Sequence, residues 1–534
     1  MKIIFVTGWV ISGLWKGITS ASIWKILAST WYKVNMVKMD PYLQIDAWTM
    51  SPYEHWEVFV TNDWGETDLD IWNYERFLWK KFYKDNNITT WKVYLDVITK
   101  ERRGDYLWKT VQIVPHITDN IKERLKYIAS FSDITIVEVG WTVWDIESLP
   151  FLEAIRQMKK DLWEENIVYI HLAPLLLLSY SWETKTKPIQ HSVSKLREYW
   201  IIPNILVCRT DNSMDKSTKD KISSLCDIPE ENIIESVNVD TIYQIPLIFK
   251  NQNLERVLEK KLKLKRKTAD LENWERLTNN IISPKWKVSI WIVWKYTKFK
   301  DTYLSLKESL IHSWANLNCK MNITWIDSEE LELKENVDKY LNELVNKWEL
   351  DWMIVAWWFW QRWVEWKILA IKFARENNIP FLWICLWLQL AVIEFMRNVW
   401  NMKWANSTEF DEKTKYPVVD FLLGQKDIEN MWWTMRLWNY NAILQEGTLV
   451  SKIYWSLNIW ERHRHRYEIN PKFHKQILEL GLIISGKSPD WKLVEFIEYP
   501  NNKFFVATQA HPEFKSSLEN PHPLFIEFVK SSMK

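Results

Sequence analysis

A lysine near the N-terminus stands where a protein can bind phosphate groups. The apolar run Lys2–Thr7 predicts a buried strand, and a loop over residues 8–15 leads from it to Lys16. A strand, a loop of small residues, a lysine and a helix form an arrangement that holds phosphates on backbone N–H groups. The loop is one residue longer than a standard phosphate loop, and no serine or threonine follows Lys16 directly. The alternative is an ordinary strand-to-helix turn.

Two carboxylates downstream can bind the metal ion that phosphoryl transfer needs. Asp70 belongs to the acidic segment 66–70, and Glu138 lies at the end of the predicted strand Ile134–Val139. Mg²⁺ takes oxygen ligands and lies beside the transferred phosphate. Either acidic group alone is typical of a solvated surface. Together with Lys16 they predict a magnesium–nucleotide site.

A cysteine in the second half has the sequence context of a nucleophile. Cys385 follows an apolar run and precedes a predicted helix, a turn that exposes the thiol and favours the thiolate. His511 and Glu513 can serve as its base and as the group that orients the base. The loop 357–359 would supply oxyanion donors. The alternative is a buried core cysteine.

The basic segment 461–466 has two interpretations. It could be a solvated or nucleic-acid-facing patch, or it could supply an arginine that binds a carboxylate. Since the chain as a whole is close to neutral, we favour the carboxylate clamp.

Tryptophan is far too common in this chain and glycine far too rare. The sequence holds 39 tryptophans and 10 glycines, although glycine makes up about 7% of an ordinary chain, roughly 37 residues at this length. Tryptophans crowd the segments described above, where tight turns and close approach to a phosphate need a residue without a Cβ. We hypothesise that many of these tryptophans are encoded by UGA codons that the source organism reads as glycine. The protein made with glycine at those codons is called the glycine-decoded chain below. The tryptophans at the candidate sites are Trp9, Trp15, Trp141, Trp144, Trp357, Trp358, Trp360, Trp383 and Trp387.

The elements that must position these groups alternate in type, which predicts βαβ units and a doubly wound parallel sheet of the α/β class. The strands expected in the first half are 2–7, 33–38, 134–139, 167–172 and 205–208, and the helices are 20–29, 117–129, 149–160 and 192–199. A charge-rich stretch follows, and a second α/β pattern opens at residue 288 with strands at 351–355 and 380–384 and a helix at 368–377. We therefore expect one domain over residues 1–266, a linker over 267–285 and a second domain over 286–534.

The bulk composition excludes several classes. A net charge of +1 gives no electrostatic case for a nucleic-acid partner. Four cysteines without paired spacing argue against a disulfide framework or a zinc site. No apolar stretch approaches the roughly 20 residues that span a membrane, and the N-terminal run is too short for a signal peptide. We expect a cytoplasmic protein that does not bind membranes.

Several longer motifs carry a resemblance to a known family. They are Lys38–Tyr42, Thr49–His55, Asp145–Met158, Lys185–Pro188, Asn406–Phe410 and Arg462–Glu468. In their order and spacing, the chain resembles the CTP synthases over essentially its whole length. The resemblance implies an N-terminal ATP/UTP-binding synthetase (amidoligase) domain of the P-loop type and a C-terminal class I glutamine amidotransferase domain.

The resemblance also implies a reaction. ATP would phosphorylate oxygen 4 of UTP, and ammonia released from glutamine would then replace that phosphate and give CTP. Mg²⁺ would accompany ATP, GTP would activate the enzyme allosterically, CTP would inhibit it by feedback, and the protein would form a homotetramer.

Matching motifs imply the following site residues. ATP would be bound by Ser12, Gly13, Leu14, Trp15, Lys16, Gly17, Lys38 and Asp70, with Asp70 and Glu138 holding the metal. UTP or CTP would be bound by Ser12, Asp145, Ile146, Glu147, Lys185, Thr186, Lys187, Gln190 and Lys221. Cys385, His511 and Glu513 would be catalytic, Trp358, Leu386, Gln389, Glu409 and Arg466 would bind glutamine, and Pro52, His55 and Val58 would line the ammonia route.

Two alternatives to this function stay open. The chain could be a different glutamine-dependent amidotransferase fused to an ATP-using domain. It could also be a catalytically inactive homologue that acts as a scaffold or assembly protein, if the tryptophans are literal and fill both sites.

Overall fold

The computed structural model describes residues 1–8, 15–44, 58–63, 65–78, 80–178, 183–294, 304–327, 352–355, 364–421, 435–479 and 481–533. Its chain forms two compact units. Residues 1–50 and 67–278 make up the first unit, and residues 51–66 and 279–534 make up the second.

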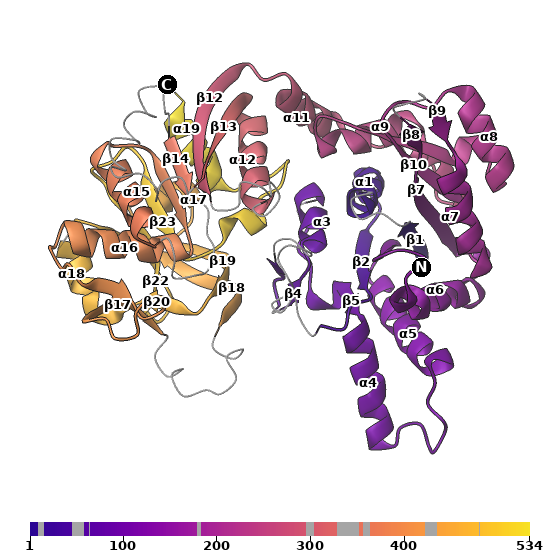
Figure 1. Cartoon of the computed structure of the whole chain (residues 1–534), viewed down its shortest axis with the longest axis horizontal. Coiled ribbons are helices and arrows are strands. Elements are labelled where there is room, and N and C mark those ends of the chain that lie inside the picture. Colours follow the sequence, from indigo (N-terminus) through magenta and orange to yellow (C-terminus); the bar gives the residue numbers. More distant parts are fainter. Residues whose placement is uncertain are drawn as a thin grey trace. The chain divides into compact units, whose positions relative to one another are not determined.

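The first unit is built on a parallel sheet (Figure 1). Within the described residues its strands run in the order β11-β10-β7-β1-β6-β2-β5, and every pair is parallel. The strands are β1 (Lys2–Gly8), β2 (Val34–Asp40), β5 (Asn87–Thr89), β6 (Ile134–Val139), β7 (Ile167–Pro174), β10 (Ile205–Thr210) and β11 (Ile233–Val237). The short pair β8 (Leu176–Leu178) and β9 (Glu183–Lys185) belongs to this unit. A second short pair, β3 (Phe59–Val60) with β4 (Glu66–Thr67), falls mostly within the segment 51–66 of the second unit.

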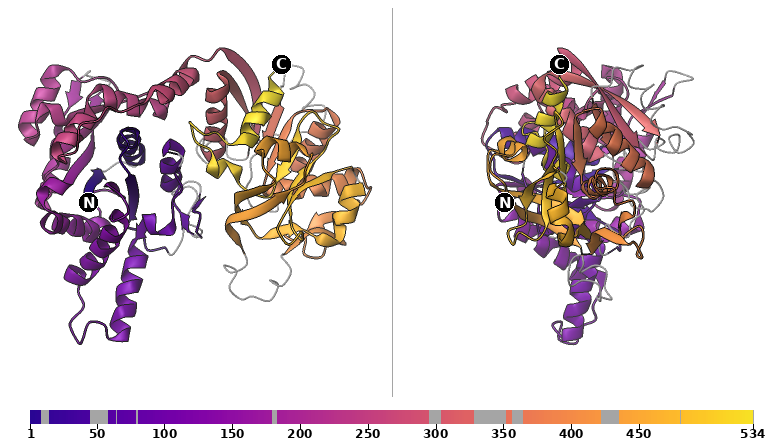
Figure 2. Two further views of the ribbon diagram at one scale, coloured as in Figure 1. Left: turned by 180° about the vertical axis from the view of Figure 1, so that it is seen from behind. Right: turned by 90° about the vertical axis from the view of Figure 1, so that its left-hand side faces the viewer.

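Helices cover the sheet because its strands are almost wholly buried and apolar. Ile3, Phe5 and Val137 point to a core that α5 and α6 close, while α1 packs with α3 and α9. Helix α4 extends away from the sheet, as two views show (Figures 1 and 2). The helices are α1 (Lys16–Ser29), α3 (Asp70–Leu78), α4 (Thr90–Arg103), α5 (Thr118–Ala129), α6 (Leu149–Leu162), α7 (Lys187–Glu198), α8 (Lys216–Cys226), α9 (Ile245–Asn251), α10 (Leu254–Lys261) and α11 (Glu272–Ile282).

The second unit has a mixed sheet with the order β13-β12-β14-β15-β23-β22-β21-β18-β19 among the described residues. Its strands are β12 (Trp286–Trp294), β13 (Cys319–Asp327), β14 (Trp352–Val355), β15 (Phe381–Ile384), β18 (Arg436–Leu444), β19 (Asn458–His465), β21 (Ile483–Lys487), β22 (Val494–Glu498) and β23 (Phe505–Thr508). The small sheet β16 (Ala405–Ser407), β17 (Tyr416–Phe421) and β20 (Tyr467–Ile469) lies apart from it. The helices are α12 (Leu304–Leu317), α15 (Val364–Glu376), α16 (Leu386–Asn398), α17 (Leu449–Tyr454), α18 (His474–Glu479) and α19 (Pro523–Ser532).

The α/β class and the parallel sheet expected for the first half are confirmed. In the described part of the chain, no helix is both long enough and apolar enough to cross a membrane.

Candidate active sites

The lysine expected to bind phosphate begins helix α1, directly after β1 and its loop. Lys16 Nζ donates to the carbonyl of Val139 at 3.1 Å and also to that of Trp141, so its side chain reaches the turn that follows β6. Burial and the positive charge of Lys38 lower the pKa of Lys16 to about 8. Ser12, Gly13 and Leu14 lie outside the described residues.

A second lysine gathers the two expected metal-binding carboxylates. Strands β2 and β6 are neighbours, and their register sets Lys38 beside Glu138. Lys38 Nζ donates to Glu138 Oε1 at 2.9 Å and to Asp70 at the start of α3. Burial opposes the charge of Lys38, but Asp70 and Glu138 raise its pKa well above the ordinary value. The structure therefore brings Lys38, Asp70 and Glu138 together.

The surroundings of this cluster suit a divalent cation. Burial and the charge of Asp70 raise the pKa of Asp40 to about 7, against the effect of Lys38. Asp40 Oδ2 is buried with no hydrogen-bond partner among the described residues. Within the part of the chain that the structure describes, no group of three or more His, Cys, Asp or Glu forms a metal cage. Mg²⁺ does not need one, because it binds through one or two carboxylates together with substrate phosphates and water.

Two segments carry most of the residues expected to bind the pyrimidine nucleotide. Asp145 follows β6 and accepts a hydrogen bond from the Thr142 N–H at 2.7 Å, and the next residues, Ile146 and Glu147, are exposed. Since β6 and β7 flank β1 in a parallel sheet, the segments that follow them lie at the edge to which the phosphate loop belongs.

The other segment is the N-terminal turn of α7. Gln190 donates to the Thr186 hydroxyl at 3.0 Å, and Lys187 is exposed. Lys185 lies on β9 just before this helix, and Lys221 is exposed on α8, which packs beside α7.

The expected nucleophile stands on a sharp turn in the second unit. Cys385 joins β15 to α16 with φ 59° and ψ −112°, a strained backbone that projects the side chain as nucleophile elbows do. Its N–H donates to the Thr508 carbonyl at 2.7 Å, and Gln509 Nε2 lies 3.7 Å from its Sγ. Because β15 and β23 are parallel neighbours, Cys385 and the segment after Thr508 leave the sheet at one edge.

His511 and Glu513 form the pair expected beside that cysteine. His511 Nδ1 lies 2.6 Å from Glu513 Oε1, and both side chains are buried. Burial alone would lower the pKa of His511, but Glu513 and the Cys385 side chain raise it to about 10. The raised pKa favours an imidazolium at His511, which carries a proton that it can give to a leaving group.

Two of the residues expected to bind glutamine, Leu386 and Gln389, lie at the start of α16. Gln389 Nε2 donates to the Tyr467 carbonyl at 2.8 Å, and its buried Oε1 has no hydrogen-bond partner among the described residues. Burial raises the pKa of Glu409 to about 7, against the lowering effect of nearby Lys367 and Arg466. Leu386 is buried in the first turn of α16, and Trp358, with the loop 357–359, lies outside the described residues.

A segment from the first part of the sequence packs on the second unit. The Arg462 guanidinium donates to Asn62 Oδ1 at 2.8 and 3.1 Å, and Arg464 Nε donates to Glu66 at 3.1 Å. Phe59 makes an edge-to-face contact with Phe514, the neighbour of Glu513. Val58 is half-buried at the start of this segment, whereas Pro52 and His55 lie outside the described residues.

Two site residues were not singled out from the sequence. Tyr74 donates to Glu138, and it lies four residues after Asp70 on α3, a spacing that places both on one helix face. Gln509 contacts both Cys385 and Gln389. Tyr74 could have been found from its helical spacing, whereas the role of Gln509 depends on the pairing of β15 with β23.

Comparisons with known proteins found similarity over both halves of the chain. The family model "CTP synthase N-terminus" matches residues 2–264, and "Glutamine amidotransferase class-I" matches residues 298–531. A CTP synthase of Methanocaldococcus jannaschii is 53% identical over 100% of this chain and 98% of its own length. One of Methanococcus maripaludis is 52% identical over 100% of both chains. A solved Trypanosoma brucei CTPS glutaminase domain with bound acivicin is 35% identical and covers 46% of this chain and 93% of its own, with a TM-score of 0.43.

Proposed function

Since the chain belongs to the CTP synthase family of glutamine-hydrolysing ligases, we propose that it converts UTP to CTP with ATP and glutamine. The observation that carries this proposal is the presence, in one chain, of two complete sets of reactive groups. Lys16 and Lys38 with two carboxylates form the first set, and the Cys385–His511–Glu513 triad forms the second.

In the first step, oxygen 4 of the uracil attacks the γ-phosphorus of ATP. A new O–P bond forms, the bond to the β-phosphate oxygen breaks, and ADP leaves. Lys16 and Lys38 neutralise the phosphate charge that moves during this transfer. Asp70 and Glu138 would hold Mg²⁺, which supplies further charge neutralisation and orients the phosphates. In the second step, ammonia adds to carbon 4 and inorganic phosphate leaves.

The triad supplies the ammonia. The Cys385 thiolate attacks the side-chain amide of glutamine, and His511 gives its proton to the departing nitrogen. Water then hydrolyses the thioester and releases glutamate. Glu513 holds the imidazole in place throughout. From the family resemblance, ammonia would travel along Pro52, His55 and Val58.

We also propose the remaining properties that the family resemblance implies. These are the residue assignments for ATP, UTP or CTP and glutamine, activation by GTP, inhibition by CTP, a homotetramer, and domains over 1–266 and 286–534 with a linker over 267–285. Exposed apolar side chains on α4, Leu95 and Ile98, support self-association. All four cysteines are unpaired thiols, which supports a reducing, cytoplasmic location.

A direct assay tests the proposed reaction. The glycine-decoded chain, given ATP, UTP, glutamine and Mg²⁺, is expected to form CTP, ADP, phosphate and glutamate in equal amounts. ATP hydrolysis with another acceptor and none with UTP would indicate a different amidotransferase. No turnover at all, with a folded protein, would favour the inactive scaffold.

The raised pKa of Glu409 predicts how glutamine affinity depends on pH. A carboxylate attracts the substrate's ammonium group, so binding requires the ionised form. Because its pKa is about 7 in the free protein, the KM for glutamine should stay flat above pH 7 and rise up to about tenfold per pH unit below it. Steady-state kinetics from pH 5.5 to 8.5 measure this. The Glu409→Gln variant should show a high KM without that slope, and an unchanged slope in the variant would contradict the assignment.

A further inference from the structure

Tryptophan occupies the backbone conformations that suit it least. Of the seventeen described residues other than glycine with positive φ, nine are tryptophan. A Cβ crowds the backbone there, so glycine is favoured and asparagine or aspartate tolerated. Asparagine and aspartate account for five of the others, as expected. The nine are Trp15, Trp31, Trp108, Trp141, Trp163, Trp200, Trp438, Trp455 and Trp491.

Four of these tryptophans end helices in the way that glycine does. Trp31, Trp163, Trp200 and Trp455 come within two residues of the last residue of α1, α6, α7 and α17. The Trp200 N–H donates to the Arg197 carbonyl at 2.8 Å and the Trp31 N–H to that of Ala28 at 3.0 Å. A true glycine of this chain, Gly104, ends α4 with φ 84° and the same kind of bond, to Glu101 at 2.9 Å. The position after a helix that calls for a left-handed residue is usually filled by glycine.

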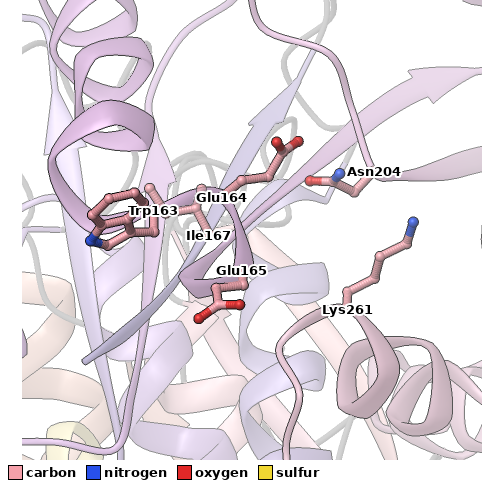
Figure 3. Close-up of a pocket in the computed structure, with 6 residues that line it drawn as sticks. All are labelled: Trp163, Glu164, Glu165, Ile167, Asn204 and Lys261. Atoms are coloured by element: carbon pink, nitrogen blue, oxygen red, sulfur yellow. The ribbon is translucent and has the colours of Figure 1, made fainter.

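The indoles at these helix ends are largely exposed to solvent and bury little apolar surface. Their exposed fractions are 85% for Trp31, 75% for Trp163, 82% for Trp200 and 93% for Trp455. In Figure 3 the Trp163 indole lies on the opposite side of a surface hollow from Lys261, and the other lining residues except Ile167 are polar. Large aromatic side chains are normally well buried.

Trp274, in contrast, is buried and hydrogen-bonded, so it serves as a comparison for the exposed tryptophans. Trp274 lies within α11, fully buried, and its Nε1 donates to the Tyr243 carbonyl at 2.7 Å. Its ring packs against Phe77 and Tyr243 with centroids 5.3 and 5.6 Å apart, which is the usual spacing of aromatic pairs. At this position the indole fills the core and its N–H satisfies a buried carbonyl, which glycine could not do.

We infer that the nine tryptophans with positive φ are glycine in the protein that the source organism makes, and that Trp274 is a genuine tryptophan. At Trp15 the consequence is functional. This residue precedes α1 with φ 63°, and its indole stacks on the Arg209 guanidinium at 4.0 Å. With glycine there, no indole would stand beside the start of α1, where backbone N–H groups can bind a phosphate.

Mass spectrometry of peptides from the protein purified from its source organism tests this inference without any assay of the reaction. We expect glycine at the nine positions and tryptophan at position 274. Tryptophan at the nine positions, or glycine at 274, would overturn it.

Thermal unfolding of the glycine-decoded chain gives a second measurement. Returning tryptophan to position 31, 200 or 455, one at a time, is expected to lower Tm by about 2 °C or more, because the left-handed backbone resists a Cβ. The Trp274→Gly variant should also lower Tm, by more, because it removes a packed and hydrogen-bonded ring. A rise in Tm on returning the three tryptophans would count against the inference.

A different observation concerns a histidine buried beneath the phosphate loop. His171 pairs with Thr7 in the register of β7 and β1, and its Nδ1 lies 2.8 Å from Thr7 Oγ1. Its Nε2 lies 2.6 Å from Ser192 Oγ on α7. All three side chains are buried. Burial and the charge of Lys16 lower the pKa of His171 to about 3, so the neutral ring bridges two hydroxyls.

We also propose that His171 is a positioning residue, which holds α7 against the end of β1. Thr7 directly precedes the glycine that opens the phosphate loop, and Ser192 lies two residues after Gln190. The bridge would thus fix the distance between the ATP-binding loop and the residues expected to bind UTP. This role rests on the proposed function.

Kinetics of His171→Gln, Ser192→Ala and the double variant test the bridge. We expect the KM for UTP to rise about tenfold with a smaller change in kcat, and the double variant to be no worse than the single ones, because the residues act as one unit. The conservative Ser192→Thr variant should restore most of the affinity. An unchanged KM for UTP together with a lower Tm would overturn the proposal and leave a packing role. Failure of the unmodified chain to form CTP would instead refute the proposed function.

Discussion

Replacing Cys385 with alanine in the glycine-decoded chain is expected to abolish glutamine-dependent CTP formation and to spare the reaction with free ammonia. In the proposed mechanism the thiol makes the covalent bond that releases ammonia from glutamine, so its loss should lower kcat with glutamine by about 10⁴-fold or more. The Lys38 cluster belongs to the other unit, and the proposed mechanism gives it no part in the hydrolysis of glutamine. CTP formation from ammonium salts should therefore stay within roughly twofold of the unmodified chain.

The chain offers a matched control for this change. Cys319 is also buried in the second unit, at the start of β13, and burial raises the pKa of its thiol to about 11. Cys319→Ala removes the same atoms from an inert thiol and should leave the glutamine reaction intact. If Cys385→Ala keeps glutamine-dependent activity, or loses the ammonia reaction as well, the assignment of the nucleophile is wrong.

Much of the first unit could be predicted because its strands are marked by short stretches of neighbouring residues. The buried parallel strands are short apolar runs, and those expected from the sequence correspond to β1, β2, β6, β7 and β10. Lys16, Asp70 and Glu138 were expected to lie together because phosphoryl transfer needs carboxylates that hold Mg²⁺ near the lysine. The edge strand β5, with three residues, is too short to carry a pattern.

In the second unit, the burial of one basic segment could not be predicted from the sequence. The basic segment 461–466 has the composition of a solvated surface, yet it lies largely in β19 with Arg462, His463 and Arg464 buried. Burial of Arg462 and Arg464 is tolerated because their guanidinium groups bond to Asn62 and Glu66, some 400 residues away in sequence. No local pattern contains such partners, so the packing of residues 58–66 on this unit could not be foreseen.

The Glu138→Gln variant should have the opposite effect to Cys385→Ala. It removes one of the two carboxylates that Lys38 gathers and that would hold Mg²⁺. CTP formation is expected to fall at least about 100-fold with glutamine and with ammonia alike, because both depend on the same phosphoryl transfer. Hydrolysis of glutamine by the triad should continue, which shows that the chain is folded. The Mg²⁺ concentration needed for half-maximal activity should rise.

A matched carboxylate separates the loss of this group from a general loss of stability. Glu235 lies on β11 of the same sheet and accepts a hydrogen bond from the Met214 N–H at 3.1 Å, so Glu235→Gln makes the same chemical change away from the cluster. Removing the Glu138 charge leaves Lys38 with Asp70 and is expected to cost about 1–3 kcal/mol of unfolding free energy. If both variants lose the same stability but only Glu138→Gln loses CTP formation, the carboxylate acts in the chemistry. Equal activity in the two variants would show that phosphoryl transfer does not use Glu138.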